Sequence, residues 1–91
     1  MIQRELVICN KLGLHARAAA KLAQTASSFQ SDIRLARPGR NEFINAKSIL
    51  GILMMAAAAG TRLHITIEGR DELAAVAAIE ELIHSRFGET E

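Results

Sequence analysis

Short segments in which apolar and polar residues alternate restrict this chain to a small set of folds. The most regular covers residues 62–68, where Leu63, Ile65 and Ile67 alternate with polar residues. Alternation gives a strand one apolar and one polar face, whereas buried parallel strands are apolar throughout. The sequence therefore predicts an antiparallel sheet with its second face in water.

Three further segments are predicted strands. Residues 2–9, with Arg4 as the exception, and residues 32–36 also alternate with a period of two. Pro38–Gly39 then combines a fixed φ with a residue that is free to take a positive φ, which is typical of a tight turn. The return strand after this turn is expected over residues 42–45.

Three helices are predicted from apolar residues spaced three and four apart. The first covers residues 16–28. The second follows Ser48, a favourable N-cap residue, and runs through the apolar residues 49–59, which are closed by a glycine. The third begins at Asp71, where negative charge suits a helix N-terminus, and stops near Gly88. Its apolar stripe consists of Leu73, Val76, Ile79, Leu82 and Ile83.

The order strand, helix, strand, strand, helix, strand, helix predicts an α+β fold. In this fold three helices cover one face of a four-stranded antiparallel sheet. The 91 residues are expected to form a single domain, residues 1–91, because a chain of this length can bury only one core. The acidic tail, residues 88–91, is expected to be frayed.

Composition excludes several classes of partner and cofactor. A formal net charge of +1 lacks the positive field that binding to nucleic acid requires, and the absence of Trp and Tyr removes aromatic platforms for bases. We therefore expect no nucleic-acid partner. Cys9 is the only cysteine, so it can form no internal disulfide and has no neighbours for a zinc site. No metal and no cofactor are predicted.

The sequence also predicts the cellular compartment of the protein. Its first residues carry charges where a secretory signal needs an apolar run. No apolar segment reaches the roughly 18 to 20 residues of a membrane span. Both observations predict a cytoplasmic protein with no direct membrane binding.

One segment, Gly13–Arg17, combines a nucleophile, a cation and a helix start. If the helix begins at Ala16, His15 is the N-cap residue and lies beside amides that have no partner within the helix. The positive end of the helix dipole disfavours a charged imidazole and stabilises an anion. A neutral ring can attack a phosphoryl donor, and Arg17 and the free amides can bind the phosphoryl oxygens. The segment thus predicts a phosphohistidine at His15.

A histidine at a helix start is more often an ordinary polar cap, so this pattern alone is a weak signal. His64 lies on the polar side of its strand and His84 lies near the exposed end of the last helix. Both are expected to face solvent without a functional role, and neither forms a metal-ligand set with His15.

Two motifs make the signal much more specific. Residues 10–17, NKLGLHAR, precede an Ala-rich helix, and residues 45–51, NAKSILG, lie at a matching separation. Together they resemble the two signatures of the HPr family, the histidine-containing phosphocarriers of the bacterial phosphotransferase system. The resemblance extends over essentially the whole chain.

This resemblance implies an open-faced β-sandwich of order βαββαβα and a carrier protein that is not an enzyme. It implies that His15 accepts a phosphoryl group from phosphorylated enzyme I and passes it to IIA proteins or domains, in sugar uptake or its regulation. Arg17 would steady the phosphoryl group.

The chain departs from the family pattern in two places. Ala18 stands where family members usually carry proline. Because Ala is a good helix former, only a small change in rigidity is expected. The hairpin over residues 37–43 is also slightly longer than is common, which shifts the numbering of Ser48 but leaves its motif intact.

Ser48 has a structural and a regulatory interpretation. Its hydroxyl is predicted to cap the second helix, a contribution of about 1 kcal/mol. By resemblance it matches the serine that the HPr kinase/phosphorylase modifies in many bacteria, which predicts a regulatory phosphosite and this kinase as a further partner. The added charge would repel a phosphorylated partner.

The second helix is apolar on more than one face, and a domain of this size cannot enclose all of it. Part of the helix is expected in the core. Ile49, Leu50 and one or both of Leu53 and Met54 are expected to stay partly exposed beside His15. We call these four residues the docking patch, because they are predicted to receive transient partners.

Three other functions are compatible with part of these observations. A paralogous carrier of the nitrogen-related branch would serve regulation instead of sugar uptake, although the NAKS-type motif favours the ordinary carrier. A small non-catalytic regulatory α+β domain would use His15 only as a cap, but the sequence indicates no ligand pocket. A phosphate-handling enzyme is disfavoured because no second acid, base or metal cluster accompanies His15.

Overall fold

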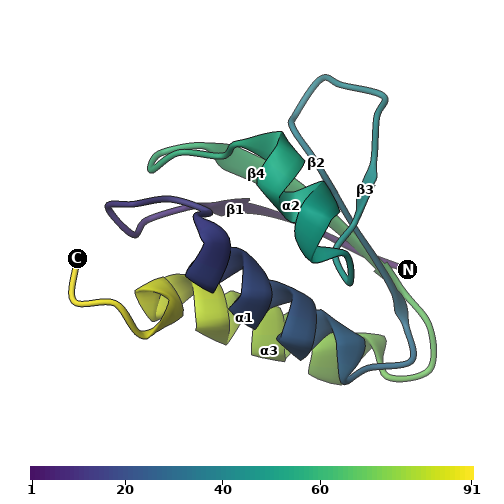
Figure 1. Cartoon of the computed structure of the whole chain (residues 1–91). Coiled ribbons are helices and arrows are strands. Elements are labelled where there is room, and N and C mark those ends of the chain that lie inside the picture. Colours follow the sequence, from purple (N-terminus) through teal and green to yellow (C-terminus); the bar gives the residue numbers. More distant parts are fainter.

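Four antiparallel strands form one sheet in the computed structural model, which describes residues 1–91 (Figure 1). The strands lie in the order β1-β4-β2-β3. Their bounds are Ile2–Val7 for β1, Asp32–Ala36 for β2, Ile44–Asn45 for β3 and Arg62–Glu68 for β4. The antiparallel sheet predicted from alternating residues is confirmed.

The strand β4 pairs along its length with both β1 and β2. Leu63 of β4 lies opposite Leu6 of β1, and Ile65 lies opposite Leu35 of β2. Leu63, Ile65 and Ile67 are buried, while the residues between them are not. The alternation in the sequence thus corresponds to an inner and an outer face of the sheet.

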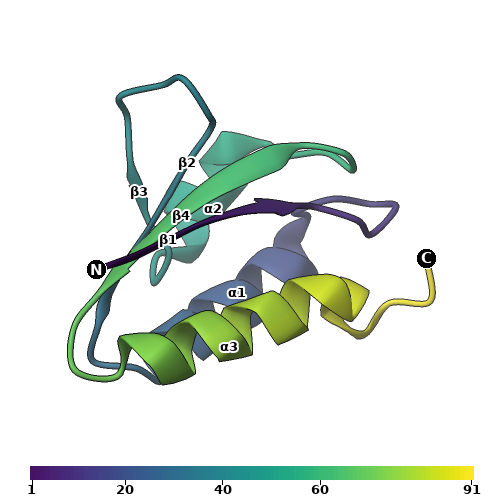
Figure 2. The ribbon, with the colours of Figure 1, turned by 180° about the vertical axis from the view of Figure 1, so that it is seen from behind.

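Three α-helices cover one face of the sheet (Figures 1 and 2). Their bounds are Ala16–Ser27 for α1, Ile49–Met55 for α2 and Glu72–His84 for α3, and a 3-10 turn, η1, follows at Arg86–Gly88. The helices α1 and α3 lie side by side and run in opposite directions, and α2 packs on α1. None of the helices has the length and apolar character needed to cross a membrane.

The core lies between the sheet and the helices. The inner face of α1 consists mostly of alanine, so its backbone lies close to the sheet, and Phe29 packs half-buried at its end. The larger fully buried side chains come from the strands and from every helix, with Leu22 the one large apolar side chain that α1 contributes, and they also include Leu35, Ile52, Leu63, Ile79, Ile83 and Phe87.

The helix α2 is shorter than the sequence predicts. It ends at Met55 because Ala56 takes a left-handed conformation with a φ of 51°. The carbonyls at this end are satisfied by distant parts of the chain. The Arg37 guanidinium donates to the Met55 carbonyl at 2.7 Å, and the Leu14 amide donates to the Ala57 carbonyl at 2.8 Å. These tertiary hydrogen bonds replace those that a longer helix would make.

Two smaller predictions also differ from the structure. The strand β3 covers only Ile44–Asn45 of the predicted residues 42–45, so most of the hairpin between β2 and β3 is an unpaired loop. Leu73 was expected in the apolar stripe of α3, but it is 76% exposed. It lies six positions before the buried Ile79, which places it about 120° away around the helix.

The side chain of Asp71 ties the start of α3 to the loop between α1 and β2. Its carboxylate accepts hydrogen bonds from the Gln30 amide at 2.8 Å, the Ser31 amide at 3.0 Å and the Ser31 hydroxyl. The Ser31 hydroxyl, followed by the Gln30 amide, holds the pKa of the Asp71 carboxyl below its usual value.

We predict that Asp71→Asn lowers the melting temperature at pH 7, because the amide nitrogen of Asn offers no acceptor to a backbone N–H. The folded-state pKa of Asp71 lies below its unfolded-state value, so the contribution is complete at neutral pH. It is lost as the pH falls through the folded-state pKa. The difference in melting temperature between wild type and variant should therefore shrink below about pH 4. A difference independent of pH would contradict this assignment.

Candidate functional site

The loop between β1 and α1 is held in place by a close backbone contact with residues 57–58. Gly13 has a φ of 69°, and a Cβ atom added to it would lie 2.6 Å from the Ala57 carbonyl oxygen. The next residue, Leu14, is buried and donates its amide to that same oxygen. Glycine is needed here both for the left-handed backbone and for the close approach.

His15 is the N-cap residue of α1, as the sequence predicts. Its backbone is extended, and its Nδ1 accepts a hydrogen bond from the Arg17 amide at 3.3 Å. The first amides of the helix, at Ala16, Arg17 and Ala18, have no carbonyl partner within the helix. Because the His15 side chain is 29% exposed, the ring is accessible to solvent and is not sealed in the core.

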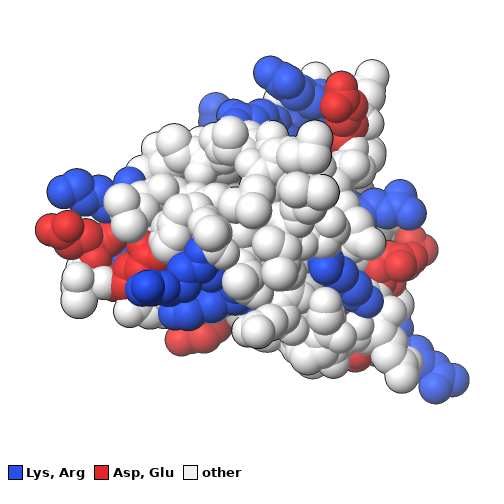
Figure 3. Space-filling view, in the orientation of Figure 1, with Lys and Arg blue, Asp and Glu red and all other residues white.

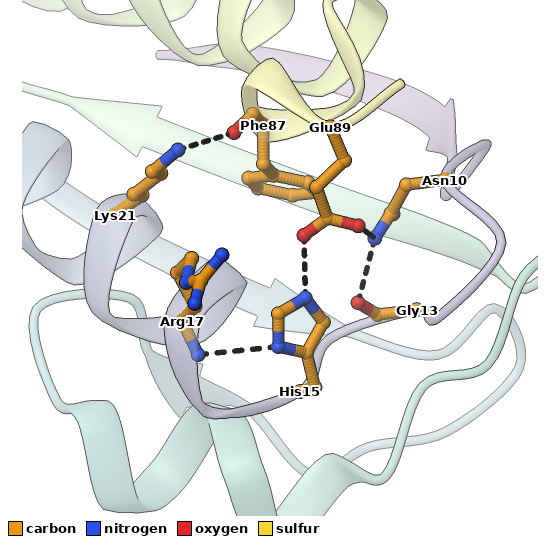
Figure 4. Close-up of polar contacts among 7 residues, drawn as sticks. All are labelled: Asn10, Gly13, His15, Arg17, Lys21, Phe87 and Glu89. Carbon is orange, nitrogen blue, oxygen red and sulfur yellow. Dashed lines mark hydrogen bonds and ion pairs between the residues drawn. The ribbon is translucent and has the colours of Figure 1, made fainter. Parts of the chain in front are cut away.

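The other ring nitrogen of His15 contacts an acidic side chain from the far end of the chain. Its Nε2 is hydrogen-bonded to the Glu89 carboxylate, whose second oxygen accepts from the Asn10 side-chain amide at 3.0 Å (Figure 4). Asn10 is fully buried and donates the same nitrogen to the Gly13 carbonyl at 2.8 Å. The loop before α1 and the residues after η1 thus meet at the His15 ring.

These two partners assign the tautomer of the ring. Nδ1 accepts a backbone N–H, so it carries a lone pair and no proton. Nε2 faces a carboxylate, which only accepts, so Nε2 carries the proton. The ring therefore presents Nδ1 as its nucleophilic atom, on the side of the helix N-terminus.

The Glu89 carboxylate is well supplied with donors. The Asn10 amide, followed by the His15 ring nitrogen, holds the pKa of the Glu89 carboxyl below its usual value, and the charge of Lys21 acts in the same direction. Glu89 is therefore ionised at neutral pH.

The position of Glu89 differs from the frayed tail expected over residues 88–91. Phe87 is only 1% exposed and anchors the chain in the core just before the tail. Lys21 of α1 donates to the Phe87 carbonyl at 2.6 Å, and the Lys11 amide donates to the Glu91 carbonyl at 2.6 Å. The tail is thus bound on both sides of the Glu89 side chain, beside the loop that follows β1 (Figures 1 and 2).

An open groove beside the ring has a basic rim. Lys11, Arg17 and Lys21 line it together with residues 88–91. The Arg17 side chain is exposed and makes no ion pair. In Figure 3 a group of Lys and Arg side chains lies over the start of α1, with acidic side chains close by at the end of the chain. The Arg17 guanidinium is therefore available to an anion bound at the helix N-terminus.

Ser48 occupies the N-cap of α2, as predicted, and its hydroxyl accepts a hydrogen bond from the Gly51 amide at 3.1 Å. Gly51 sits tightly against the sheet, because a Cβ atom added there would lie 2.7 Å from a methyl group of Ile44. The glycine inside the helix is thus explained by close packing of α2 on β3.

All four residues of the docking patch are exposed on α2. The exposed fractions are 45% for Ile49, 68% for Leu50, 36% for Leu53 and 76% for Met54, while Ile52 and Met55 of the same helix are buried. Figure 3 shows the surface over α2 as a broad area free of charged side chains. The division of this helix into a core side and an exposed apolar side is confirmed.

Comparison with known proteins agrees with this arrangement. A family model described as the phosphorylation site of the phosphotransferase-system HPr component matches residues 2–85. The phosphocarrier protein HPr of Xylella fastidiosa strain 9a5c is 51% identical over 89 residues, covering 98% of each chain. That of Cupriavidus necator is 48% identical over 91 residues, covering all of both chains.

Solved structures show the same fold. The crystal structure of HPr-C-His from Thermoanaerobacter tengcongensis matches with a TM-score of 0.93 and 43% identity, and covers 100% of both chains. A phosphocarrier protein HPr from Bacillus anthracis matches with a TM-score of 0.83 and 36% identity, covering 90% of this chain and 95% of the other.

Fold, site and relatives together define a phosphocarrier protein, which takes up and passes on a phosphoryl group and is not a catalytic enzyme. The chain belongs to the HPr family of the phosphotransferase system.

The sequence pointed to His15 and Arg17 through their motif, but it gave no indication of Glu89. That residue is 74 positions from His15 and lies in a short polar segment without periodicity. Asn10 belongs to the same motif as His15, yet its bond to Glu89 could not be anticipated. The packing of Phe87 in the core, together with the hydrogen bonds of Lys21 and Lys11 to the tail, brings the two ends of the chain together.

Proposed function

We propose that this protein carries a phosphoryl group on His15, received from phosphorylated enzyme I and delivered to IIA proteins or domains in sugar uptake or its regulation. The observation that carries the proposal is the His15 ring at the N-terminus of α1, partly exposed, with the Nδ1 lone pair facing the Arg17 amide. The protein would do this work in the cytoplasm.

The transfer follows from the assigned tautomer. The Nδ1 lone pair attacks the phosphorus of the donor, the Nδ1–P bond forms, and the bond from phosphorus to the donor breaks with its electron pair leaving on the donor. At 3.3 Å the bond from the Arg17 amide to Nδ1 is long, so the amide can turn to a phosphoryl oxygen at little cost. The neighbouring free amides and the Arg17 guanidinium supply further donors.

A carrier has to release what it binds. Charge stabilisation at an exposed helix terminus is typically about 0.3 to 1 kcal/mol, which holds the phosphoryl group without trapping it. The partly exposed ring suits this role, because a partner can reach the phosphorus directly.

Phosphorylation by enzyme I and phosphoenolpyruvate tests the proposal. Intact-mass measurement should show one added phosphate that is lost in acid, and His15→Ala should take up none. His84→Ala is the matched control, because it removes an exposed histidine outside the site and should leave uptake unchanged. An acid-stable phosphate, or uptake that persists in His15→Ala, would exclude His15 as the acceptor.

We further propose that Ser48 is a regulatory phosphosite and that the docking patch receives the partners. Ser48 is only partly buried at the start of α2, and the patch occupies the exposed side of the same helix. A phosphate on Ser48 would place negative charge beside the patch and repel a phosphorylated donor.

With ATP and the HPr kinase/phosphorylase, we predict an acid-stable phosphate that persists in His15→Ala and disappears in Ser48→Ala. Ser48→Ala should also lose about 1 kcal/mol of unfolding free energy, since the Gly51 amide loses its acceptor. Ser27→Ala, which changes an exposed serine in the last turn of α1, is the control for both measurements. Phosphate that survives in Ser48→Ala would place the modification elsewhere.

A further inference from the structure

We propose that Glu89 is a positioning residue that keeps the proton on Nε2 of His15 both before and after phosphoryl transfer. The inference rests on the proposed phosphorylation of His15 and adds a third side chain to that reaction, beside His15 and Arg17. Its basis is the hydrogen bond between Nε2 and the Glu89 carboxylate, opposite the ring nitrogen that faces the helix.

The Glu89 carboxylate is fixed in this place and is not a chance contact of a loose tail. Its side chain is only 16% exposed. The side-chain amide of the buried Asn10 donates a hydrogen bond to the second carboxylate oxygen of Glu89 at 3.0 Å. The backbone amide of Glu89 donates to the Arg86 carbonyl at 2.9 Å. With Phe87 anchored in the core just before it, Glu89 has little freedom to leave the ring.

The proton on Nε2 matters at both stages of the transfer. When Nδ1 forms its bond to phosphorus, the ring gains a positive charge as long as Nε2 keeps its proton. A carboxylate hydrogen-bonded to Nε2 stabilises that charge. In the onward step the Nδ1–P bond breaks, its electron pair returns to Nδ1, and the ring leaves as neutral imidazole. Without the Nε2 proton it would have to leave as an imidazolate anion, which is a much poorer leaving group.

Other charged groups near the ring do not supply this function. Lys11, Arg17 and Lys21 line the groove beside Glu89 and are all cations. The Glu91 side chain, the only other acidic side chain there, pairs with Lys11 at 3.6 Å and is exposed. Glu89 is thus the one acceptor in contact with Nε2.

The test uses ¹⁵N NMR of the histidine ring in the full chain, free and after phosphorylation by enzyme I and phosphoenolpyruvate. Glu89→Gln removes the charge and Glu89→Ala removes the acceptor. At a pH where both forms of the phosphorylated ring are present, the ratio of protonated to unprotonated Nε2 should fall about three- to tenfold in Glu89→Gln. It should fall further in Glu89→Ala. Glu91→Gln is the matched control and should leave the ratio unchanged.

A pH profile of the onward transfer to a IIA protein gives a second readout that a purely structural role would not change. As the pH rises, the transfer rate of Glu89→Gln should begin to fall at a pH about half a unit to one unit lower than that of wild type. This shift in pH corresponds to the three- to tenfold change in the protonation ratio. Thermal unfolding checks that the variants are folded.

The outcomes separate this inference from the proposed function. If neither wild type nor variants take up phosphate on His15, the proposed function is wrong and this inference is wrong with it. If His15 is phosphorylated but the Nε2 ratio is the same in wild type and Glu89→Gln, only the role of Glu89 is refuted. Faster uptake in Glu89→Gln with an unchanged ratio would show that the carboxylate merely obstructs the site.

Discussion

Replacing Gly13 by alanine should lower the free energy of unfolding by about 3 kcal/mol and displace His15. The left-handed backbone alone costs an L-residue about 1 to 2 kcal/mol, and overpacking typically adds about 1 to 3 kcal/mol. The new Cβ would lie 2.6 Å from the Ala57 oxygen and 2.9 Å from the Ala58 Cα. Both are backbone atoms that cannot turn aside, so the loop that leads into His15 has to shift.

Gly39→Ala separates the two costs. Gly39 has a φ of 81°, but nothing lies within 4 Å of the Cβ that alanine would add. This variant should therefore show only the backbone cost and leave phosphoryl uptake at the wild-type rate. Urea unfolding of Gly13→Ala and Gly39→Ala measures the difference in unfolding free energy. If the dependence on urea concentration has the same slope in both variants, the difference follows from the two midpoint concentrations. Equal destabilisation would mean that the contact with residues 57–58 does not hold the loop.

Phe87→Ala should be the most destabilising change outside the loop, at about 3 to 5 kcal/mol, the usual cost of truncating a buried phenylalanine. Phe87 is only 1% exposed and joins the core from the turn η1. Its loss should also release the residues that follow, including Glu89. In the phosphorylated protein the ratio of protonated to unprotonated Nε2 should then fall as it does in Glu89→Gln.

Leu73→Ala is the control for this change. Leu73 is also a large apolar side chain of the last third of the sequence, but it is 76% exposed. Its truncation should change the unfolding free energy by no more than about 0.5 kcal/mol. Phe87→Leu keeps most of the buried side-chain volume, so its loss of unfolding free energy should lie between those of Phe87→Ala and Leu73→Ala. A Phe87→Ala variant that keeps the wild-type ring protonation would show that the tail is held by its polar contacts alone.

The sheet could be predicted closely because its signal is local. In β4 every second residue is apolar, and these residues, Leu63, Ile65 and Ile67, form the side of the strand that faces the core. The start of α1 could also be predicted from the sequence, because an Ala-rich segment directly follows His15. These features depend on the chain's own periodicity and capping, so no distant residue was needed to predict them.

The two largest differences from the sequence predictions, the end of α2 and the position of Glu89, depend on distant contacts. The end of α2 is set by Arg37 and Leu14, which take carbonyls that an apolar run would otherwise use in a longer helix. The Glu89 contact depends on the burial of Phe87 and on Asn10, more than 70 positions away along the chain. An acidic polar tail is typical of a frayed end, and only the tertiary structure shows it bound to the site.

Phosphoryl transfer is expected at a single atom, Nδ1 of His15, held at the N-terminus of α1. The most direct measurement is NMR of the phosphorylated protein with ¹⁵N-labelled histidine, in which the coupling to ³¹P identifies the bonded nitrogen. The structure predicts a single coupled nitrogen, Nδ1 of His15, with the proton still on Nε2. A phosphate bonded to Nε2, or to His64 or His84, would contradict the account.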